Sequence, residues 1–266
     1  MEVRPLRIGL IGHGKMGAAL LTRWRNVGTH DFWVIDPAGT GDFGDGRTHF
    51  LASPPPFADC RFDLIIVAVK PQLIETVLPD YSGRLAKGGF IASIAAGFSI
   101  ARLRSVIGDV PIVRIMPNLP AAIGAGVSGL CADASATPSQ REAITTLMET
   151  AGLTIWVDDE DQLDRLTAVA GSGPGYVFEM ARCYVDAAKS LGFSTEQARN
   201  LVLGTLAGSI AMAQADTVSL AELRTSVTSK NGTTEAGLAA LNGDGGLSRR
   251  IGATVEAAYA RAVELR

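Results

Sequence analysis

Three glycines near the amino terminus have the types and spacing of a phosphate-binding loop. Gly12, Gly14 and Gly17 form the pattern GxGxxG between an apolar run at residues 7–11 and a helical pattern at residues 18–28. The first glycine permits a tight turn, the second lets the backbone approach a pyrophosphate, and the third allows close helix packing. Free N–H groups at the start of the helix attract phosphate. The pattern predicts a dinucleotide site, with a purely structural glycine turn as the alternative.

Asp36 ends the second apolar run, about 20 residues beyond the glycine loop, where dinucleotide-binding folds place a ribose-binding acid. A carboxylate there accepts hydrogen bonds from the adenosine ribose, which favours NAD over NADP. The segment that follows, residues 37–57, is rich in Gly and Pro. Arg47 within it either meets a 2′-phosphate or is solvated. The sequence therefore leaves the choice between NADH and NADPH open.

A polar stretch near the carboxyl-terminal end has neither His nor Cys and no carboxylate before Glu235. It reads LRTSVTSKNGTTEAGL, residues 223–238, and its second half forms a short helical pattern. Backbone N–H groups between Ser229 and Thr234 would then lie at a helix start and could hold a carboxylate. The alternative is ordinary capping of that helix by Asn231 or Thr233.

A glycine-rich break interrupts the helical pattern upstream of this stretch. Gly171-Ser172-Gly173-Pro174 separates two segments with helical periodicity. The break lets backbone and a hydroxyl approach a ligand, or it marks a kink or boundary of a helix.

The elements that must position these residues fall into two regions. Six apolar runs of strand length precede residue 160, and only helical patterns follow Gln162. We expect an α/β fold, with a Rossmann-type doubly wound parallel sheet in residues 1–160 and an all-helical domain in residues 161–266, whose apolar helices suggest packing between subunits. Strand ends at Lys70, Ala96-Gly97 and Asn118 would share the carboxyl edge of the sheet. From spacing alone, Lys70 is either a cofactor ligand or a surface lysine, and Asn118 either a cofactor ligand or a turn former.

Composition argues against several classes of partner. The 266 residues are 47% hydrophobic and 19% charged, with a formal net charge of −3, which gives no electrostatic case for nucleic acid. Neither a long apolar run nor a signal-peptide pattern is present. The potential metal ligands are unclustered: Cys60, Cys131, Cys183, His13, His30 and His49. We expect a cytoplasmic, metal-free protein that binds neither nucleic acid nor membrane.

Taken together, these motifs resemble the pyrroline-5-carboxylate reductase family. The resemblance covers nearly the whole chain and rests on GHGKMGAAL, AVKPQ, SIAAG, RIMPNLPA, AGSGPGYVF and, most specifically, LRTSVTSKNGTTEAGL. It implies NAD(P)H-dependent reduction of a cyclic imino acid, 1-pyrroline-5-carboxylate, to L-proline, the last step of proline synthesis. It also implies that the all-helical domain of residues 161–266 is a substrate-binding and dimerisation domain, in a homodimer or a higher homo-oligomer, up to a decamer.

The resemblance, together with the motifs above, assigns site residues. For the cofactor these are Gly12, Gly14, Lys15, Met16, Gly17, Asp36, Ala68, Val69, Lys70, Pro71, Ala95, Ala96, Gly97, Asn118 and Ser226. For the substrate they are Ser172, Gly173, Ser229, Gly232, Thr233 and Thr234. Thr234 is the expected catalytic residue, because its hydroxyl would face the ring nitrogen. A protonated imine already accepts hydride at carbon, so orientation matters more than a strong acid.

The chain departs from the family pattern at three places. Lys230-Asn231 replaces Pro-Gly, Leu119 replaces Thr, and Ala170 replaces Ser. The departures keep open a different cyclic imine as substrate, or a protein that binds NAD(P)H without catalysis. A β-hydroxyacid dehydrogenase fits less well, because Lys189 is not followed by an Asn in register.

Overall fold

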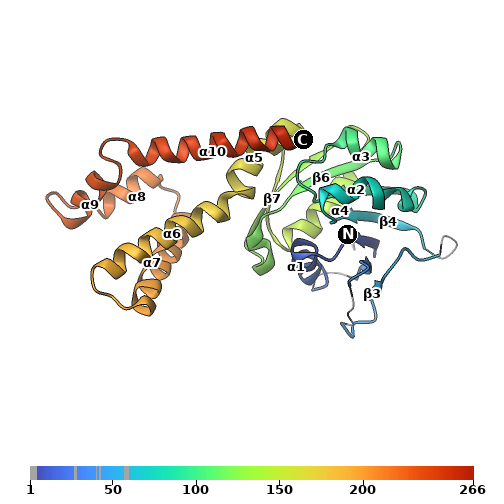
Figure 1. Ribbon diagram of the computed structural model, residues 1–266, viewed down its shortest axis with the longest axis horizontal. Helices are drawn as coiled ribbons and strands as arrows, with labels where there is room; N and C mark the ends of the chain where they lie inside the picture. Colours follow the sequence, from blue (N-terminus) through green and yellow to red (C-terminus); the bar gives the residue numbers. More distant parts are fainter. Residues whose placement is uncertain (1–4, 27–28, 40, 42, 57–59) are drawn as a thin grey trace. The chain divides into compact units, whose positions relative to one another are not determined.

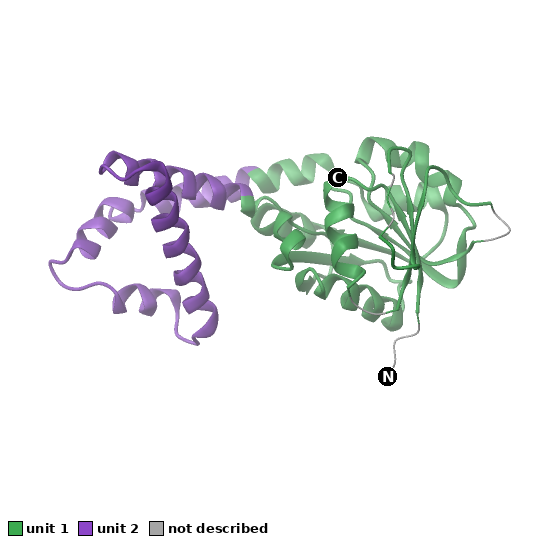
Figure 2. Ribbon diagram, turned by 90° about the horizontal axis from the view of Figure 1, so that it is seen from below, with its two compact units in different colours: residues 1–174, 258–266 green, residues 175–257 purple. Residues whose placement is uncertain are grey.

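The chain forms two compact units, shown in the computed structural model of Figure 1 and coloured separately in Figure 2. The structure describes residues 5–26, 29–39, 41, 43–56 and 60–266. Unit 1 consists of Met1–Pro174 and Ala258–Arg266, and unit 2 of Gly175–Ala257. The sequence boundary expected at residues 160/161 stays a prediction.

Unit 1 is built on one eight-stranded sheet with the strand order β3-β2-β1-β4-β5-β6-β7-β8. Neighbouring strands are parallel except β6 and β7, which pair antiparallel. The strands are β1 (Arg7–Ile11), β2 (Asp31–Ile35), β3 (Thr48–Leu51), β4 (Phe62–Val67), β5 (Leu85–Ser93), β6 (Ile112–Met116), β7 (Gly126–Ala132) and β8 (Gly152–Trp156). The expected Rossmann-type, mainly parallel sheet is confirmed.

Two of these strands, β3 and β7, were not expected from the sequence. β3 has only four residues and lies in a segment rich in Gly and Pro, which is typical of loops. β7 contains two glycines, and one of them has a packing reason. A Cβ at Gly129 would lie 2.7 Å from the Leu166 side chain, so glycine at this position leaves room for that side chain, at the cost of a lower β propensity.

Helices cover both faces of the sheet. β1 shows the division: Ile8 and Leu10 pack in one core with residues of α1 and α4, and Ile11 packs in another with residues of α2, α3 and α5. This follows from strand geometry, since successive side chains point to opposite faces. The helices are α1 (Lys15–Trp24), α2 (Pro71–Val77), α3 (Ile100–Ile107), α4 (Pro138–Glu149) and α5 (Glu160–Leu166), with short 3₁₀ turns η1 (Leu78–Tyr81) and η2 (Leu119–Ile123).

The glycine-rich break after α5 is a helix irregularity. One π-helical turn, η3 (Thr167–Gly171), joins α5 to α6 (Gly173–Ser190). The Ser172 N–H donates to the Thr167 carbonyl oxygen at 2.9 Å, the wider spacing that defines such a turn. The backbone therefore stays nearly helical through the break, and ligand contact by Ser172 or Gly173 stays a prediction.

Unit 2 is entirely helical and exposes much apolar surface. It contains α7 (Thr195–Ala215), α8 (Leu220–Ser226), α9 (Thr233–Asn242) and most of α6 and α10 (Gly246–Leu265). Its buried cluster is small: Ala188, Ala198 and Val202. Large apolar side chains such as Phe178, Ile210 and Met212 are about half exposed or more. Apolar surface on this scale marks a protein interface.

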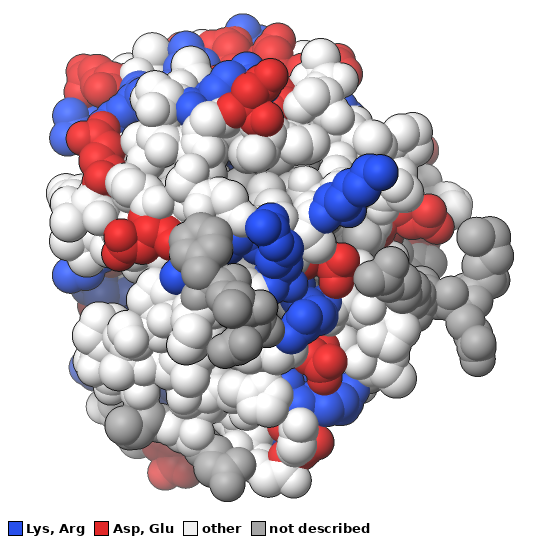
Figure 3. Space-filling model, turned by 90° about the vertical axis from the view of Figure 1, so that its right-hand side faces the viewer, with Lys and Arg blue, Asp and Glu red and all other residues white. Residues whose placement is uncertain are grey.

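The surface carries charges of both signs. On the face shown in Figure 3, Lys and Arg are interspersed with Asp and Glu. Within the described residues, no helix is both long and apolar enough to cross a membrane.

Asp45 organises the turn that leads into β3. Its carboxylate accepts hydrogen bonds from Arg25 Nε (2.7 Å), from the Arg47 N–H (3.0 Å) and from the Thr48 N–H and hydroxyl (both 2.9 Å). Burial alone would raise the pKa of Asp45, but these donors outweigh burial and hold the pKa far below its usual range. A depressed pKa means that the carboxylate stabilises the fold above its unfolded pKa and loses this effect as the pH falls.

We expect Asp45→Asn to lower the free energy of unfolding by about 2–4 kcal/mol at neutral pH, because Arg25, two backbone N–H groups and a hydroxyl lose a charged acceptor. The difference from the unmodified protein should shrink below about pH 4, where the unfolded carboxyl becomes protonated. Urea unfolding at several pH values measures both effects, with Glu142→Gln on the exposed side of α4 as the control. A difference independent of pH would contradict the assignment.

Candidate active site

The expected cofactor residues of unit 1 lie along one edge of the sheet. β1, β4, β5 and β6 are adjacent and parallel, so their carboxyl ends meet at that edge. The loops that follow these strands carry residues 12–17, 68–71, 95–97 and 118. The strand order reverses between β1 and β4, and ligands of doubly wound sheets bind at such a switch point.

Each glycine of the first loop has a distinct surrounding. Gly12 has a φ of +96°, and a Cβ there would lie 2.9 Å from the Ala68 backbone. A Cβ at Gly17 would lie 2.8 Å from the Gly12 carbonyl oxygen, so α1 packs tightly on the loop. At Gly14, in contrast, a Cβ would meet nothing within 4 Å. Gly12 and Gly17 are required by packing, whereas Gly14 borders open space.

The open space at Gly14 suits the pyrophosphate of a dinucleotide. Gly14 is the N-cap of α1 and provides no side-chain cap. The first-turn N–H groups, from Lys15, Met16 and Gly17, therefore have neither a helical partner nor a cap from that residue. Such N–H groups, at the positive end of the helix dipole, bind phosphate oxygens. The loop fits the phosphate part of NAD(P)H.

The next two loops continue this edge. The Ala68 N–H donates to the Ile11 carbonyl oxygen at 2.8 Å, which holds residues 68–71 beside the glycine loop. Val69 is partly buried, whereas Lys70 is exposed at the N-cap of α2, and Pro71 begins that helix. In the loop after β5, Ala96 is exposed and Gly97 has a φ of +67°.

Asn118 is buried and is engaged at both ends of its side chain. Its Oδ1 accepts the Val127 N–H at 2.9 Å, and its Nδ2 donates to the Ala170 carbonyl oxygen at 3.0 Å. The residue therefore connects β7 to the π-helical turn. One N–H of the amide remains for a cofactor, and that contact stays a prediction.

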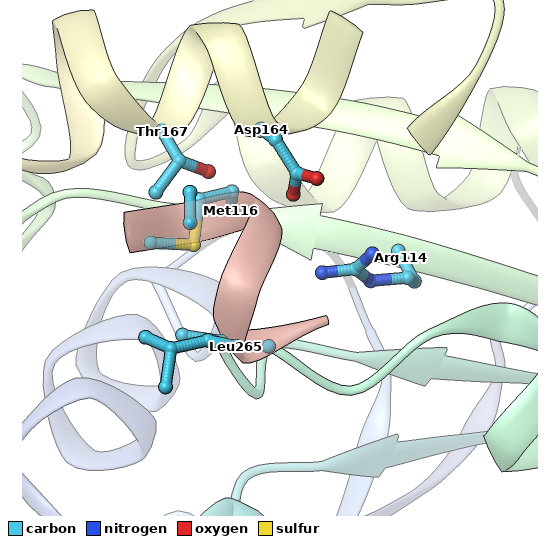
Figure 4. Close-up of a pocket in the computed structure, with 8 residues that line it drawn as sticks. Arg114, Met116, Asp164, Thr167 and Leu265 are labelled. Atoms are coloured by element: carbon cyan, nitrogen blue, oxygen red, sulfur yellow. The ribbon is translucent and has the colours of Figure 1, made fainter. Parts of the chain in front are cut away.

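A buried ionic cluster supports the Gly97 loop, and sequence reasoning missed it. In Figure 4, Arg114 and Asp164 point into one small pocket of unit 1 that Gly97 and Leu265 also line. Arg114 Nη1 lies 2.6 Å from Glu160 Oε1, and Asp164 Oδ2 lies 3.0 Å from Arg266 Nη1.

Burial raises the pKa of Asp164, against the opposing charges of Arg266 and Arg114. A Cβ at Gly97 would lie 2.7 Å from the Leu265 carbonyl oxygen, so the end of α10 packs directly on the loop. The sequence feature that could have revealed this ionic cluster is Arg114, a charged residue inside the otherwise apolar strand PIVRIM.

The expected substrate loop lies in unit 2, between α8 and α9. α9 begins at Thr233, and its N-cap is Gly232, which provides no side-chain cap. Neither Asn231 nor Thr233 occupies the N-cap position, so the capping alternative does not describe this helix. The Gly232 N–H already donates to the Ser229 carbonyl oxygen at 3.0 Å. The first-turn N–H groups of Thr233, Thr234 and Glu235 have no helical partner, and those of Thr233 and Thr234 are the ones that we assign to a carboxylate.

Lys230-Asn231, the departure from the family pattern, has a conformational explanation. Asn231 has a φ of +59°, in the left-handed region, and is the one residue other than glycine with a positive φ among those that the structure describes. Asn tolerates this region better than most residues, so it can replace a glycine. The Asn231 N–H donates to Glu235 Oε2 at 2.6 Å, which fixes the turn from the helix side. Lys230 is exposed.

The remaining predicted residues are placed as follows. Ser226 ends α8, and its hydroxyl donates to the Leu223 carbonyl oxygen at 2.8 Å. Ser229 and Thr234 are exposed in unit 2, and Ser172 and Gly173 lie at the junction of η3 and α6 in unit 1.

Two stretches of the chain match known families. Residues 160–265 match pyrroline-5-carboxylate reductase dimerisation, and residues 7–97 match NADP oxidoreductase coenzyme F420-dependent. A pyrroline-5-carboxylate reductase of Pseudomonas aeruginosa is 37% identical over 268 residues, which cover 97% of this chain and 96% of the relative. The chain belongs to the pyrroline-5-carboxylate reductase family.

Other members of the pyrroline-5-carboxylate reductase family agree in sequence and fold. The Mycobacterium tuberculosis relative is 34% identical over 98% of this chain and 97% of its own length. A Coxiella burnetii structure, 30% identical, matches with a TM-score of 0.88 over 97% of both chains. A Plasmodium falciparum structure with NADP bound, 26% identical, matches with a TM-score of 0.85 over 100% of this chain and 99% of that one. The helical region is the dimerisation region of the family, so the chain forms a homo-oligomer.

Proposed function

We propose that this member of the pyrroline-5-carboxylate reductase family reduces 1-pyrroline-5-carboxylate to L-proline with NADH or NADPH. The observation that carries the proposal is the start of α9, where an exposed Ser/Thr loop precedes a helix whose N-cap provides no side chain. The chain is also 37% identical to a relative named for this reaction.

In this proposal the chain binds substrate with uncharged groups. The N–H groups of Thr233 and Thr234, with the Ser229 hydroxyl, hold the carboxylate of the imino acid. The Thr234 hydroxyl faces the ring nitrogen: it donates to the neutral imine, accepts from the N–H of the protonated imine, or shields the nitrogen from water. Ser172 and Gly173 are further candidate substrate residues, on the strength of the AGSGPGYVF motif. These groups orient the C=N bond and need no ionised side chain.

NAD(P)H, when bound, supplies the hydride, and the imine nitrogen receives a proton. The glycine loop holds the pyrophosphate, and Lys70, residues 95–97 and Asn118 border the nicotinamide half. A fixed geometry between the two reactants is worth about 7–11 kcal/mol of the barrier. Because a protonated imine already accepts hydride, positioning is the main task of the protein.

One assay tests the proposal and separates its alternatives. The oxidation of NADH and of NADPH is followed by absorbance with 1-pyrroline-5-carboxylate and with the corresponding six-membered cyclic imino acid. We expect faster turnover with the five-membered ring. Preference for the six-membered ring would assign another imine, and nucleotide binding without oxidation by either imine would identify a non-catalytic binding protein.

We also propose that the homo-oligomer is built from dimers, as two chains or as a decamer, in the cytoplasm. The exposed apolar side chains of unit 2 support burial against a second copy. Light scattering of the purified protein gives the number of chains.

A further inference from the structure

The proposed function leaves open whether the ribose of the dinucleotide carries a 2′-hydroxyl, as in NADH, or a 2′-phosphate, as in NADPH. A phosphate monoester has a charge of about −1.5 to −2 at neutral pH, so the residues around the ribose must treat the two nucleotides differently. In doubly wound folds the ribose lies at the carboxyl end of the second strand, which is β2 here. The charges at the carboxyl end of β2 therefore determine which of the two nucleotides binds more tightly.

Asp36 occupies the carboxyl end of β2 and faces the glycine loop. Its Oδ2 accepts the His13 N–H at 2.7 Å, and its Oδ1 accepts the Ala38 N–H at 2.9 Å. These two bonds fix the half-buried carboxylate beside the loop that would hold the pyrophosphate. A carboxylate offers about four acceptor sites, so both oxygens can still accept a ribose hydroxyl. A phosphate at the same place would meet a negative charge.

The segment that follows β2 contains one Lys or Arg, and this residue lies near the opposite edge of the sheet. Arg47 is the only Lys or Arg between Asp36 and Arg61. Arg47 immediately precedes β3, which runs parallel to β2. At the amino end of the pair, the Phe32 N–H donates to the Arg47 carbonyl oxygen at 2.8 Å. At the carboxyl end, the Asp36 N–H donates to the Leu51 carbonyl oxygen at 3.0 Å. The four steps along the strand from Arg47 to Leu51 span about 13 Å.

A second observation agrees with this placement of the Arg47 side chain. His30 lies just before β2, at its amino end. Burial and, after it, the charge of Arg47 lower the pKa of His30. This effect of the Arg47 charge on His30 agrees with the position of Arg47 before β3, at the amino edge of the sheet. Arg61 also stays at the amino side, where its Nη1 donates to the Gly83 carbonyl oxygen at 3.0 Å, before β5.

We propose that Asp36 makes this chain prefer NADH over NADPH. The carboxylate accepts the ribose 2′-hydroxyl of NADH and repels the 2′-phosphate of NADPH, and the one Lys or Arg of residues 37–60, Arg47, precedes β3 at the opposite edge of the sheet. The inference rests on the proposed function for its reaction, whereas the nucleotide preference itself is a binding property that can be measured without an imine. Membership of the family does not by itself predict a preference for NADH, because one relative has been solved with NADP bound.

The test compares the affinities of the purified full-length protein for NADH and NADPH, by nucleotide fluorescence without imine, and then kcat/KM for each nucleotide with imine. We expect at least about a tenfold preference for NADH in both measurements. Asp36→Ser, and Asp36→Asn as the variant closer in shape, should reduce the preference at least several-fold. Asp31→Ser, at the amino end of the same strand, and Arg47→Ala should leave the ratio unchanged.

Equal or tighter binding of NADPH by the unmodified protein would overturn the inference. A loss of NADPH affinity in Arg47→Ala would also overturn the inference, because Arg47 would then bind the 2′-phosphate. An NADPH preference that disappears in Lys15→Ala would overturn it in the same way, with Lys15 as the residue that binds the phosphate. If the protein binds NADH preferentially but reduces neither imine, the proposed function fails and the inference about Asp36 stands.

Discussion

Replacing Thr234 with alanine is expected to lower the rate of imine reduction by about tenfold to a thousandfold, the range found when one oriented polar donor is lost at a reacting centre. Thr234 is exposed in the first turn of α9, two residues after the N-cap Gly232, which provides no side-chain cap. Its hydroxyl is the polar side-chain group that we place at the ring nitrogen. The measurement is kcat/KM for 1-pyrroline-5-carboxylate at a saturating nucleotide concentration.

Two control variants separate this role from a structural one. Thr234→Ser keeps the hydroxyl and should recover most of the lost activity. Thr205→Ala makes the same change on α7, where the hydroxyl only donates to the Leu201 carbonyl oxygen at 2.7 Å. We expect that variant to keep full activity, and nucleotide affinity should be normal in all three. Unchanged turnover in Thr234→Ala would remove this residue from the mechanism.

The second large effect is expected at Gly14, where a methyl group would disturb the cofactor and not the fold. A Cβ there meets no protein atom within 4 Å, so Gly14→Ala should shift Tm by no more than a few degrees. The methyl group would occupy the space in which a pyrophosphate approaches the α1 N–H groups. Losing about two charge-assisted hydrogen bonds weakens nucleotide affinity by about a hundredfold or more.

Gly12→Ala provides the contrasting result. Gly12 has a φ of +96°, and an added Cβ would lie 2.9 Å from the Ala68 backbone. This variant should lose about 2–4 kcal/mol of the free energy of unfolding, through strain and overpacking. Thermal unfolding and nucleotide titration of both variants distinguish the roles. Equal destabilisation of the two proteins would mean that Gly14 is also a packing residue.

The sequence predicted the sheet and its ligand edge because those depend on local patterns. Apolar runs define β1, β4, β5 and β6, and a parallel arrangement then brings the loops at Gly12, Lys70 and Gly97 to one edge. β7 was missed because its glycines lower the β propensity, and the space at Gly129 is taken by the side chain of Leu166, which is distant in sequence. Local propensity does not contain that information.

The candidate site shows the same division between local and long-range causes. The position of the Ser/Thr loop before α9 follows from helical periodicity. The buried pairs Arg114–Glu160 and Asp164–Arg266 join residues 46 and 102 positions apart, and no pattern in the sequence connects them. From the sequence, Lys230-Asn231 suggested a change of substrate specificity. The left-handed φ of Asn231 shows that this residue keeps a backbone conformation typical of the glycine that it replaces.

The most direct test of the account is the transfer of deuterium from reduced nicotinamide nucleotide, labelled at the transferable C4 position, to 1-pyrroline-5-carboxylate. We predict that the purified protein forms L-proline with one deuterium at the former imine carbon, and that Thr234→Ala forms it much more slowly. Proline without the label, or no proline at all, would contradict reduction of the C=N bond by hydride from the nucleotide.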